Sequence, residues 1–532
     1  MTDSPTPDRY YITTSIPYVN GTPHIGHALE YVQCDALARF HRLIGDDTRY
    51  QTGTDDNSLT NLQAADKAGI PVQELVSRNG DRFAALREPL GLSTDGIIRT
   101  STDPLHFPGA QKLWRAMAAN GDIYTREYQG LYCVRCERFY KQEELVEGKC
   151  PVHETELETV DEVNYFFRLS SYGDRLREVI ESNTYLIQPE HRREEILSFI
   201  SGGLEDISIS RSAQRSRGWG VPVPDDPDQV MYVWVDALSN YITALDYADQ
   251  GSAYERYWVN NANRVHVVGK DIIRFHAVYW PAFLLSAGLP LPTTLNVHEF
   301  IQVDGEKISK SRGNTVDPFD LVDIYGLDAL RYWLLREMPR TGDGNFSHER
   351  LISRYNEDLG NDLGNLVNRS VSMLHRYRDG EVPRVAAVTD GETPLAEVAS
   401  GLESRVRAGL DAFDFRQSLA AIWELVTAAN KYIDDTKPWV LAKAAKNGDD
   451  VADAQLDAVL ADLMETIRLL AVHLTPFIPG GAARIAQQVG IEAGVIADDG
   501  LSSLSWNGAL AGQTVPKASP IFPKIEVEAA EA

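Results

Sequence analysis

The sequence predicts an α/β fold that a cysteine-rich insertion interrupts and an all-α region follows. Three observations support this fold class. A strand–turn–helix–strand pattern opens the chain, three cysteines cluster between residues 133 and 150, and apolar residues after about Asp358 follow only helical spacing. With 532 residues, the chain has room for roughly three or four domains of about 150 residues each.

The opening pattern is typical of a βαβ unit. Tyr10–Thr14 is rich in aromatic and β-branched residues, which favour strands. The segment 15–23 contains Pro, Gly and Asn and therefore predicts a turn. Apolar residues recur at three- and four-residue steps from His24 to about Leu43, and Thr48–Gln51 follows as a short strand. This order predicts an open, mostly parallel α/β sheet.

The α/β pattern resumes after the insertion. Val230–Val235 and Val265–Gly269 are short, strongly apolar runs, and a helical stretch follows each of them. We expect both runs to be buried strands. The sheet is therefore expected to be discontinuous in the sequence.

Four amphipathic helices are predicted in the last third of the chain. Their apolar positions recur at helical spacing within Leu363–Leu374, Val398–Leu410, Leu419–Ile433 and Leu456–Leu470. Successive helices of this kind pack as a bundle.

Composition restricts the classes of function. The net charge of −26 argues against a general nucleic-acid binder, because phosphate neutralisation needs Lys and Arg. It leaves room for an RNA partner bound by a locally basic face. We find neither a secretion signal nor an apolar run long enough to span a bilayer, and we expect a cytoplasmic protein without membrane contact.

The cysteine cluster has the spacing of a zinc knuckle. Two half-sites, Cys-x-x-Cys and Cys-x-x-His, offer three thiolates and one imidazole, a closed tetrahedral set for one structural Zn²⁺. The four ligands would be Cys133, Cys136, Cys150 and His153. Disulfides or unrelated thiols are the alternative, and the absence of a secretion signal disfavours them.

A histidine pair stands at the start of the first predicted helix. His24 and His27 are three residues apart, so they lie on one helical face. The N-terminus of a helix attracts anions, and two imidazoles there can donate to phosphate oxygens. Gly26 lacks a Cβ, which would let a nucleotide approach the backbone closely. An isolated pattern of this length also occurs by chance as two surface histidines.

A second cationic motif lies near residue 310. Lys307 and Lys310 stand among serines in a segment flanked by Gly305 and Gly313, which is typical of a mobile loop. Such a loop suits transient stabilisation of negative charge on a leaving group. Taken alone, the same residues could form a solvated basic loop.

Together the motifs resemble those of a known family. The segments His24-Ile-Gly-His27 and Lys307-Ile-Ser-Lys-Ser311, in this order, resemble the class I aminoacyl-tRNA synthetases. Further matches narrow the resemblance to the methionyl-tRNA synthetases: they lie at 16–21, 219–224, 232–237, 269–276, 361–369 and 437–439. The resemblance extends from about Tyr10 to Ile525.

The resemblance implies a domain order. A Rossmann-type catalytic domain is expected in two halves around a connective zinc module, followed by a stem-contact region and an anticodon-binding helical bundle. The expected boundaries are 1–115, 116–215, 216–305, 306–365 and 366–532.

The resemblance also implies an activity: ATP-dependent activation of L-methionine to methionyl-adenylate, then transfer to tRNA(Met), with Mg²⁺ accompanying ATP. His24, His27, Lys307 and Lys310 would act in catalysis. Gly26 and Asp271 would help to bind ATP, and Asp55 the substrate ammonium. The methionine side chain would contact Ile16, Tyr18, Trp234, Ala237, Leu238, Tyr241, Ile272, His276 and Trp280. Trp439 and Arg376 would contact the anticodon.

Two positions depart from the family pattern. Asn57-Ser58 stands where a His-Gly pair is usual, and Ser372 stands where an Asn is often found. Another aliphatic class I synthetase is an alternative. However, the chain lacks room for the long editing insertion of the branched-chain enzymes. A cysteine enzyme would hold zinc in its amino-acid site, whereas the cysteines here lie in the inserted module. A catalytically idle tRNA-binding relative is a second alternative. The chain ends soon after the predicted bundle, so we expect a monomer.

Overall fold

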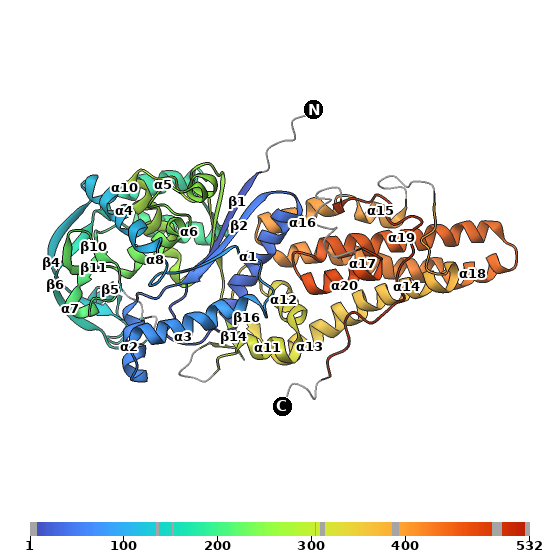
Figure 1. Cartoon of the computed structure of the whole chain (residues 1–532), viewed down its shortest axis with the longest axis horizontal. Helices are drawn as coiled ribbons and strands as arrows, with labels where there is room; N and C mark the ends of the chain where they lie inside the picture. The colour runs from blue at the N-terminus through green and yellow to red at the C-terminus, as the bar shows by residue number, and fades with distance from the viewer. Residues whose placement is uncertain are drawn as a thin grey trace. The chain divides into compact units, whose positions relative to one another are not determined.

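The computed structural model describes residues 8–134, 138–151, 154–303, 305–308, 314–385, 393–491 and 503–526 (Figure 1). The chain divides into two units. The first comprises Met1–Cys34, Thr48–Glu88 and Ser93–His298, and the second comprises Asp35–Asp47, Pro89–Leu92 and Glu299–Ala532. Among the described residues, none of the helices combines the length and the apolar composition that crossing a membrane requires.

A six-stranded sheet organises the first unit, with strand order β3-β2-β1-β12-β13-β7. The pairs β2–β3, β1–β12, β12–β13 and β13–β7 are parallel. The strands are β1 (Arg9–Thr14), β2 (Asp47–Thr54), β3 (Gly96–Arg99), β7 (Leu186–Gln188), β12 (Asn263–Gly269) and β13 (Thr294–His298). The helix α1 (Ile25–Leu43) follows β1, so the predicted βαβ unit and the strand at Val265–Gly269 are confirmed.

The prediction of a strand at Val230–Val235 is wrong beyond Met231. β11 (Asp226–Met231) ends there, and α8 (Val233–Thr243) begins two residues later. Every residue of α8 is buried. A helix that is buried on all sides shows no amphipathic period, so its sequence resembles that of a buried strand.

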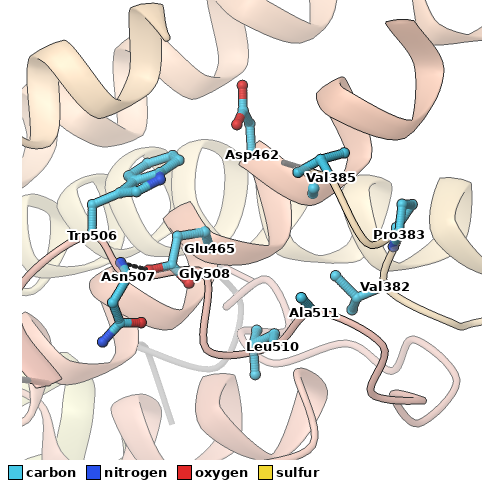
Figure 2. A pocket seen from close by; sticks show the side chains of 11 residues that line it. Val382, Pro383, Val385, Asp462, Glu465, Trp506, Asn507, Gly508, Leu510 and Ala511 are labelled. Carbon is cyan, nitrogen blue, oxygen red and sulfur yellow. Dashed lines mark hydrogen bonds between the residues drawn. The ribbon is translucent and has the colours of Figure 1, made fainter. Parts of the chain in front are cut away.

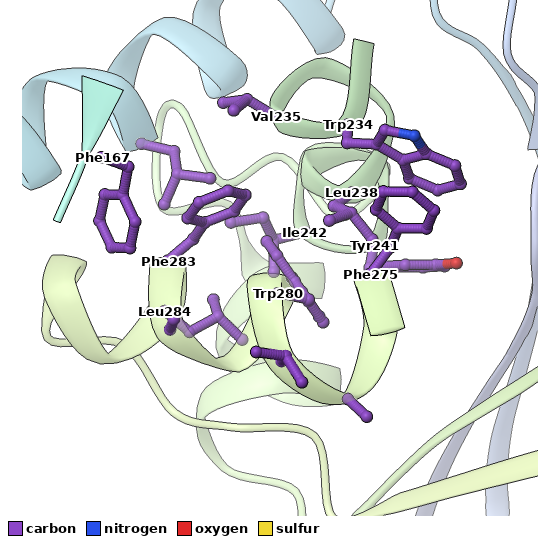
Figure 3. Close-up of a cluster of buried hydrophobic side chains, with 14 of the residues drawn as sticks. Phe167, Trp234, Val235, Leu238, Tyr241, Ile242, Phe275, Trp280, Phe283 and Leu284 are labelled. Carbon is purple, nitrogen blue, oxygen red and sulfur yellow. The ribbon is translucent and has the colours of Figure 1, made fainter. Parts of the chain in front are cut away.

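The core of the first unit is rich in aromatic side chains. Figure 3 shows part of it, where side chains of α8 lie beside those of the segment that ends in α10 (Trp280–Ala287). The remaining helices of this unit are α2 (Leu59–Ala68), α3 (Val72–Ala84), α4 (His106–Ala119), α5 (Gly173–Glu181), α6 (Glu190–Ser201), α7 (Ala213–Ser216) and α9 (Ser252–Tyr254).

The cysteine-rich segment forms a separate antiparallel sheet. Its strand order is β5-β4-β6-β8, with β4 (Ile123–Cys133), β5 (Arg138–Tyr140), β6 (Glu158–Phe167) and β8 (Ile207–Ser208). A three-stranded sheet of order β10-β11-β9 adds β9 (Ser210–Ser212) and β10 (Pro222–Val223). β7 lies inside the range expected for the insertion, and it pairs with β13 at the edge of the central sheet.

The second unit is mostly helical. A small sheet, β15-β14-β16, consists of β14 (Ile301–Val303), β15 (Glu306–Lys307) and β16 (Gly344–Phe346). The helices are α11 (Pro318–Tyr325), α12 (Leu327–Arg336), α13 (His348–Arg354), α14 (Asn365–Arg378), α15 (Pro394–Ala399), α16 (Leu402–Asp411), α17 (Phe415–Thr436), α18 (Pro438–Lys446), α19 (Asp450–Leu474) and α20 (Pro479–Gln488). Three of the four predicted helical stretches are confirmed. The other one, Val398–Leu410, is divided: α15 ends at Ala399 and α16 begins at Leu402, because Gly401 between them adopts a left-handed conformation with φ 68°.

Candidate functional site

Three predicted site segments follow the carboxyl ends of neighbouring strands. The histidine pair follows β1, Asp55 follows β2, and Asp271 follows β12. β1 lies between β2 and β12. The chain continues from β1 to β2 and β3 on one side, and later adds β12 and β13 on the other side. Open α/β sheets bind ligands at this kind of switch point, beyond the carboxyl ends of the strands. These segments therefore lie together at the carboxyl ends of the central strands.

His24 and His27 lie face to face at the start of α1. Their ring centroids are 3.8 Å apart at 29°, and Phe83 meets His27 edge-on at 5.0 Å. The backbone N–H of His24 donates to Nδ1 of His27 at 3.0 Å, and that of Gly26 donates to Nδ1 of His24 at 3.1 Å. Because both Nδ1 atoms accept, each neutral ring carries its proton on Nε2. The pair thus presents two Nε2–H donors, the polarity that phosphate oxygens need.

Gly26 has a more specific role than closeness to a ligand. A Cβ at this position would lie 2.9 Å from Cε1 and 3.0 Å from Nδ1 of His24. The ring of His24 therefore occupies the space that any other residue's side chain would need. Gly26 lets its own N–H reach that ring and thereby fixes the tautomer.

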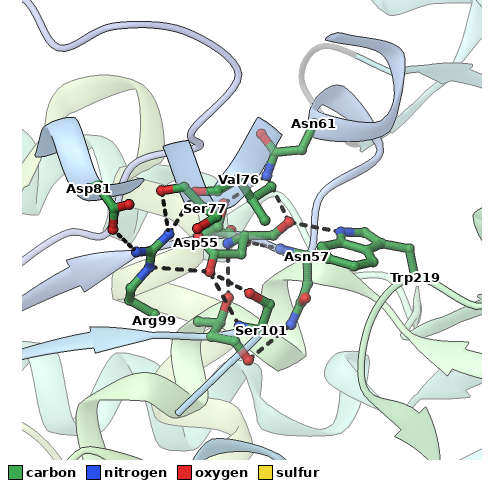
Figure 4. Close-up of polar contacts among 11 residues, drawn as sticks. Asp55, Asn57, Asn61, Val76, Ser77, Asp81, Arg99, Ser101 and Trp219 are labelled. Atoms are coloured by element: carbon green, nitrogen blue, oxygen red, sulfur yellow. Dashed lines mark hydrogen bonds and ion pairs between the residues drawn. The ribbon is translucent and has the colours of Figure 1, made fainter. Parts of the chain in front are cut away.

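Asp55 is held in a dense set of hydrogen bonds (Figure 4). Its carboxylate is buried, its N–H donates to the carbonyl of Pro17 at 2.9 Å, and it forms an isolated parallel bridge with Tyr18. Nδ2 of Asn61 donates to the carbonyl oxygens of Asp55 and Asp56, at 3.0 and 2.8 Å. The loop after β1 and the end of β2 are thus joined.

The turn after Asp55 is anchored from other segments as well. Trp219 donates from Nε1 to the carbonyl of Asp56 at 2.8 Å, and Ser101 donates to Oδ2 of Asp56 at 2.6 Å. Burial raises the pKa of Asp56, although the Ser101 hydroxyl and the nearby Arg99 charge oppose that shift. The neighbouring Asn57 donates from Nδ2 to Oδ2 of Asp236 at 2.9 Å.

The predicted methionine contacts from α8 and from 272–280 converge. Trp234 stacks on Phe275 with centroids 3.6 Å apart at 6° (Figure 3). Tyr18 meets Trp234 edge-on at 6.5 Å. Tyr241 lies beside Trp280, with ring centroids 6.0 Å apart. Ala237 and Leu238 are buried, whereas Ile16 and Ile272 are partly exposed. Aromatic and apolar walls suit a flexible thioether side chain.

Hydrogen bonds hold both histidines of this region neutral. Nδ1 of His276 lies 3.0 Å from the carbonyl of Ile272, so it donates, and Nε2 then accepts from the Tyr241 hydroxyl at 2.6 Å. Trp280 donates from Nε1 to Nε2 of His266 at 3.2 Å, and Nδ1 of His266 faces Oγ1 of Thr13 at 2.7 Å. Each ring thus has one donating and one accepting nitrogen, which is the neutral form.

Burial reinforces this neutrality. It lowers the pKa of His276 from 6.5 to about 4, against smaller raising effects from the Ile272 carbonyl and Glu30. Burial, with the nearby His276 and Arg264, holds the pKa of His266 well below its usual range. The region therefore offers an apolar side chain an uncharged surround near neutral pH.

The remaining predicted nucleotide contacts are less closely defined. Asp271 is exposed, in a short 3₁₀ turn (Lys270–Ile272) directly after β12. The backbone of Lys307 lies in β15 of the second unit. Lys310 lies outside the described residues.

Two of the four predicted zinc ligands are described. Cys133 ends β4, and Cys150 follows a turn closed by hydrogen bonds between Val146 and Lys149. Both thiols are reduced and buried, and they share a cluster with Tyr140. Cys136 and His153 lie outside the described residues. Within the described part of the chain, no three His, Cys, Asp or Glu side chains are grouped so as to hold a metal.

The predicted anticodon contacts lie on two helices of the second unit. Trp439 stands in the first turn of α18 with 45% of its surface exposed, so it is not a core residue. Arg376 is exposed in the last turn of α14. α19 packs against both helices.

A cavity of about 160 Å³ lies elsewhere in the second unit (Figure 2). Its lining comes from Val382–Val385, α19 and Trp506–Ala511, and it includes Asp462 and Glu465. Burial raises the pKa of Asp462 to about 6. None of the residues predicted to act in catalysis lines this cavity.

Sequence reasoning did not single out several residues of the site. His266 and Thr13 fix the ring network of the apolar region, and Phe275 stacks on Trp234. His106 and Asp236 form a buried pair at 2.7 Å. A polar residue inside an apolar strand, such as His266 in Val265–Gly269, was the available signal, since buried polar groups need partners.

Family models and curated relatives match nearly the whole chain. A family model described as "tRNA synthetases class I (M)" matches residues 10–164 and 143–371, and one described as "Anticodon binding domain of methionyl tRNA ligase" matches 382–532. The methionine--tRNA ligase of Brucella suis biovar 1 (strain 1330) is 44% identical, over 98% of this chain and 99% of the relative. That of Mycobacterium leprae (strain TN) is 45% identical, over 98% and 96%.

Solved structures match over the same extent. Mycobacterium tuberculosis methionyl-tRNA synthetase in complex with methionyl-adenylate has a TM-score of 0.91 and 43% identity, covering 97% of this chain and 100% of that one. The apo form of the same synthetase has a TM-score of 0.86 and 41% identity, covering 98% and 99%. The chain therefore belongs to the methionyl-tRNA synthetase family of class I aminoacyl-tRNA synthetases.

Proposed function

We propose that methionine is activated at the carboxyl ends of β1, β2 and β12. As a member of its family, the chain is a methionine--tRNA ligase: it uses ATP with Mg²⁺ to convert L-methionine to methionyl-adenylate, then transfers the methionyl group to tRNA(Met). The observation that carries the assignment of the site is the stacked histidine pair, which presents two Nε2–H donors at the switch point of the sheet.

The chemistry requires positioning more than acid–base catalysis. The methionine carboxylate is already ionised, so its oxygen attacks the α-phosphorus of ATP directly. A new P–O bond forms while the bond to pyrophosphate breaks, and negative charge leaves with the pyrophosphate. In the second step, a hydroxyl of the terminal tRNA ribose attacks the methionyl carbonyl and AMP departs.

We assign the residue roles from this chemistry. The Nε2–H groups of His24 and His27 would donate to the ATP phosphates, and Asp271 would contact adenosine beside Gly26. Asp55 would bind the methionine ammonium through a carboxylate whose turn is fixed by Asn61 and Trp219.

The apolar region would hold the methionine side chain, without a charged group to exclude it. Some of the predicted methionine contacts carry a polar group. The most deeply buried of these are Trp234, Tyr241, His276 and Trp280. The neutral tautomers of His276 and His266 support this assignment, because a thioether gains nothing from a nearby cation.

Lys310, with Lys307, would stabilise the departing pyrophosphate. We expect Lys310→Ala to lower methionine-dependent ATP–pyrophosphate exchange at least tenfold with little change in methionine affinity. Lys67→Ala, which removes an exposed lysine at the end of α2, is the matched control. Near-normal exchange in the Lys310 variant would refute its role. An absence of methionine-dependent exchange in the wild-type chain would instead favour an idle tRNA-binding relative.

We further propose one structural Zn²⁺ on Cys133, Cys136, Cys150 and His153. Two observations support the fit: Cys133 and Cys150 are reduced, and both thiols are buried in one small cluster. The metal would tie together a segment with few apolar partners. Elemental analysis should find one zinc per chain, and Cys136→Ser should lose it. Cys34→Ser, a buried thiol on α1, is the control that should retain zinc.

The helical unit is proposed to bind the anticodon through Trp439 and Arg376. Stacking of a base on an exposed indole contributes about 1–3 kcal/mol. Trp439→Ala should therefore raise the KM for tRNA(Met) about 5- to 150-fold while leaving pyrophosphate exchange unchanged. Trp439→Phe should retain part of the affinity. Equal KM values for all three proteins would exclude a stacking role. We also propose that the enzyme acts as a monomer in the cytosol, where its tRNA substrate is found.

A further inference from the structure

A buried polar cluster joins three segments that are far apart in the sequence. It consists of Asn57 after β2, His106 at the start of α4 and Asp236 in the first turn of α8. Oδ2 of Asp236 accepts from Nδ2 of Asn57 at 2.9 Å, and Oδ1 lies 2.7 Å from Nε2 of His106. His106 and Asp236 are fully buried, and Asn57 is 7% exposed.

The hydrogen bonds of this cluster have only one consistent arrangement. Both oxygens of Asp236 accept, so Nε2 of His106 must carry a proton and the Asn57 side chain must present its amide nitrogen. Nδ1 of His106 meets the hydroxyl of Thr243 at 2.9 Å, two turns after Asp236 on the same face of α8. Nδ2 of Asn57 also approaches the carbonyl of Thr100 at 3.4 Å. Every member therefore has a partner, which buried polar groups require.

Asn57 is also the residue that orients the proposed ammonium ligand. Its backbone N–H donates to Oδ1 of Asp55 at 3.3 Å (Figure 4). The same residue thus contacts Asp55 through its backbone and α8 through its side chain. α8 carries Trp234, Leu238 and Tyr241, which line the region proposed for the methionine side chain.

We propose that Asn57 is a positioning residue that sets the spacing between the ammonium-binding and side-chain-binding ends of the methionine site, acting through Asp236. The inference rests on the proposed function of that site. It also gives a role to the position where the family usually has His. A shift of the Asp55 turn relative to α8 would separate the two ends while leaving the nucleotide contacts of α1 in place.

Exchanging the two groups tests the proposal. In Asn57→Asp, two carboxylates face each other, so the turn should move. In Asp236→Asn, the single amide oxygen serves either His106 or Asn57, but not both. In the double variant Asn57→Asp/Asp236→Asn, the new amide donates to the new carboxylate and its oxygen still accepts from Nε2 of His106. The double variant should therefore restore the contact.

Methionine-dependent ATP–pyrophosphate exchange supplies the readout. Each single variant should raise the KM for methionine at least tenfold and change the KM for ATP less than twofold, and the double variant should return to within threefold of wild type. Asn261→Asp is the matched control. It alters a buried asparagine that donates to the carbonyls of Tyr257 and Asn263, remote from the cluster, and should leave both KM values unchanged.

The outcomes separate the proposal from a purely structural role. If the single variants lower only kcat or the melting temperature, or raise both KM values equally, the positioning role is wrong. A folded double variant that recovers no methionine affinity overturns it as well. If Asn57→Asp does not fold, Asn57→Ser, which removes the donor without adding charge, is measured in its place. Absence of exchange in the wild-type chain would count against the proposed function instead.

Discussion

Lowering the pH from 8 to 5 should destabilise the helical unit through His473 in α19. This residue is fully buried, with Nε2 donating to the carbonyl of Leu504 at 3.3 Å. Nδ1 has no hydrogen-bond partner among the described residues. Burial lowers the pKa of His473 from 6.5 to about 4, assisted by the charges of Arg468 and Arg405 and opposed by the Leu504 carbonyl.

The sign and size of the effect follow from proton linkage. Between pH 6.5 and about 4, the unfolded chain binds a proton at His473 that the folded chain does not, so stability falls as the pH falls. At pH 5 the loss amounts to about 2 kcal/mol relative to pH 8. Above pH 6.5 the contribution is constant.

Urea unfolding followed by far-UV circular dichroism at pH 8 and pH 5 measures this loss. His473→Gln, whose amide can still donate to Leu504, removes the titrating group. The pH-dependent drop in unfolding free energy should be about 2 kcal/mol smaller in the variant, or about 0.7 M in urea midpoint for an m-value of about 3 kcal/mol/M. An equal drop in both proteins would show that His473 does not titrate as its burial requires.

Two further substitutions test contacts described above. Gly26→Ala should displace the His24 ring, because the added Cβ would lie 2.9 Å from Cε1 of that ring. We expect the kcat of pyrophosphate exchange to fall at least tenfold while methionine affinity is retained. An unchanged kcat would contradict the role of Gly26 in fixing the His24 tautomer. Arg331→Met should lower the unfolding free energy by about 3–5 kcal/mol, since Arg331 and Asp35 form a fully buried ion pair at 2.7 Å. Calorimetry measures this loss, and a change below about 1 kcal/mol would contradict the assigned burial.

The parts of the fold with regular periodicity could be predicted from the sequence. The long helix α17 and the first half of α19 expose one polar face, so apolar spacing identifies them. In α1, the apolar residues keep helical spacing between polar ones, although most of the helix is buried. α8 could not be identified in this way, because all its residues are buried and no polar face marks the helical period. Only the tertiary packing shows that this strand-like sequence forms a helix.

Sequence reasoning proposed types of site residue but not their partners. Motif order singled out His24, His27 and Asp55. The partner of Asn57 lies 179 residues away, and no local pattern connects two such positions. The need for Gly26 likewise became evident only from the ring of His24, whose orientation the sequence does not specify. Side-chain geometry between distant segments therefore accounts for most of what sequence reasoning missed.

The buried guanidinium of Arg331 has a consequence for synthesis of the chain. It bonds to Asp35 and to the carbonyl oxygens of Leu90, Pro476 and Phe477. On the ribosome, Asp35 must therefore wait for Arg331, which emerges 296 positions later, or roughly 15–60 s at usual elongation rates. Arg331 in turn waits for Pro476 and Phe477.

The first unit has no such delay, because its last residue is His298. During translation the first unit can complete its sheet before the second unit is made. Until then, the part of α1 from Asp35 onward lacks the residues of the second unit that it packs with. Premature termination before Arg331 would leave Asp35 without this ion pair, and termination between Arg331 and Pro476 would leave the guanidinium without two of its carbonyl acceptors. Quality-control proteases should recognise such truncated chains through this uncovered part of α1.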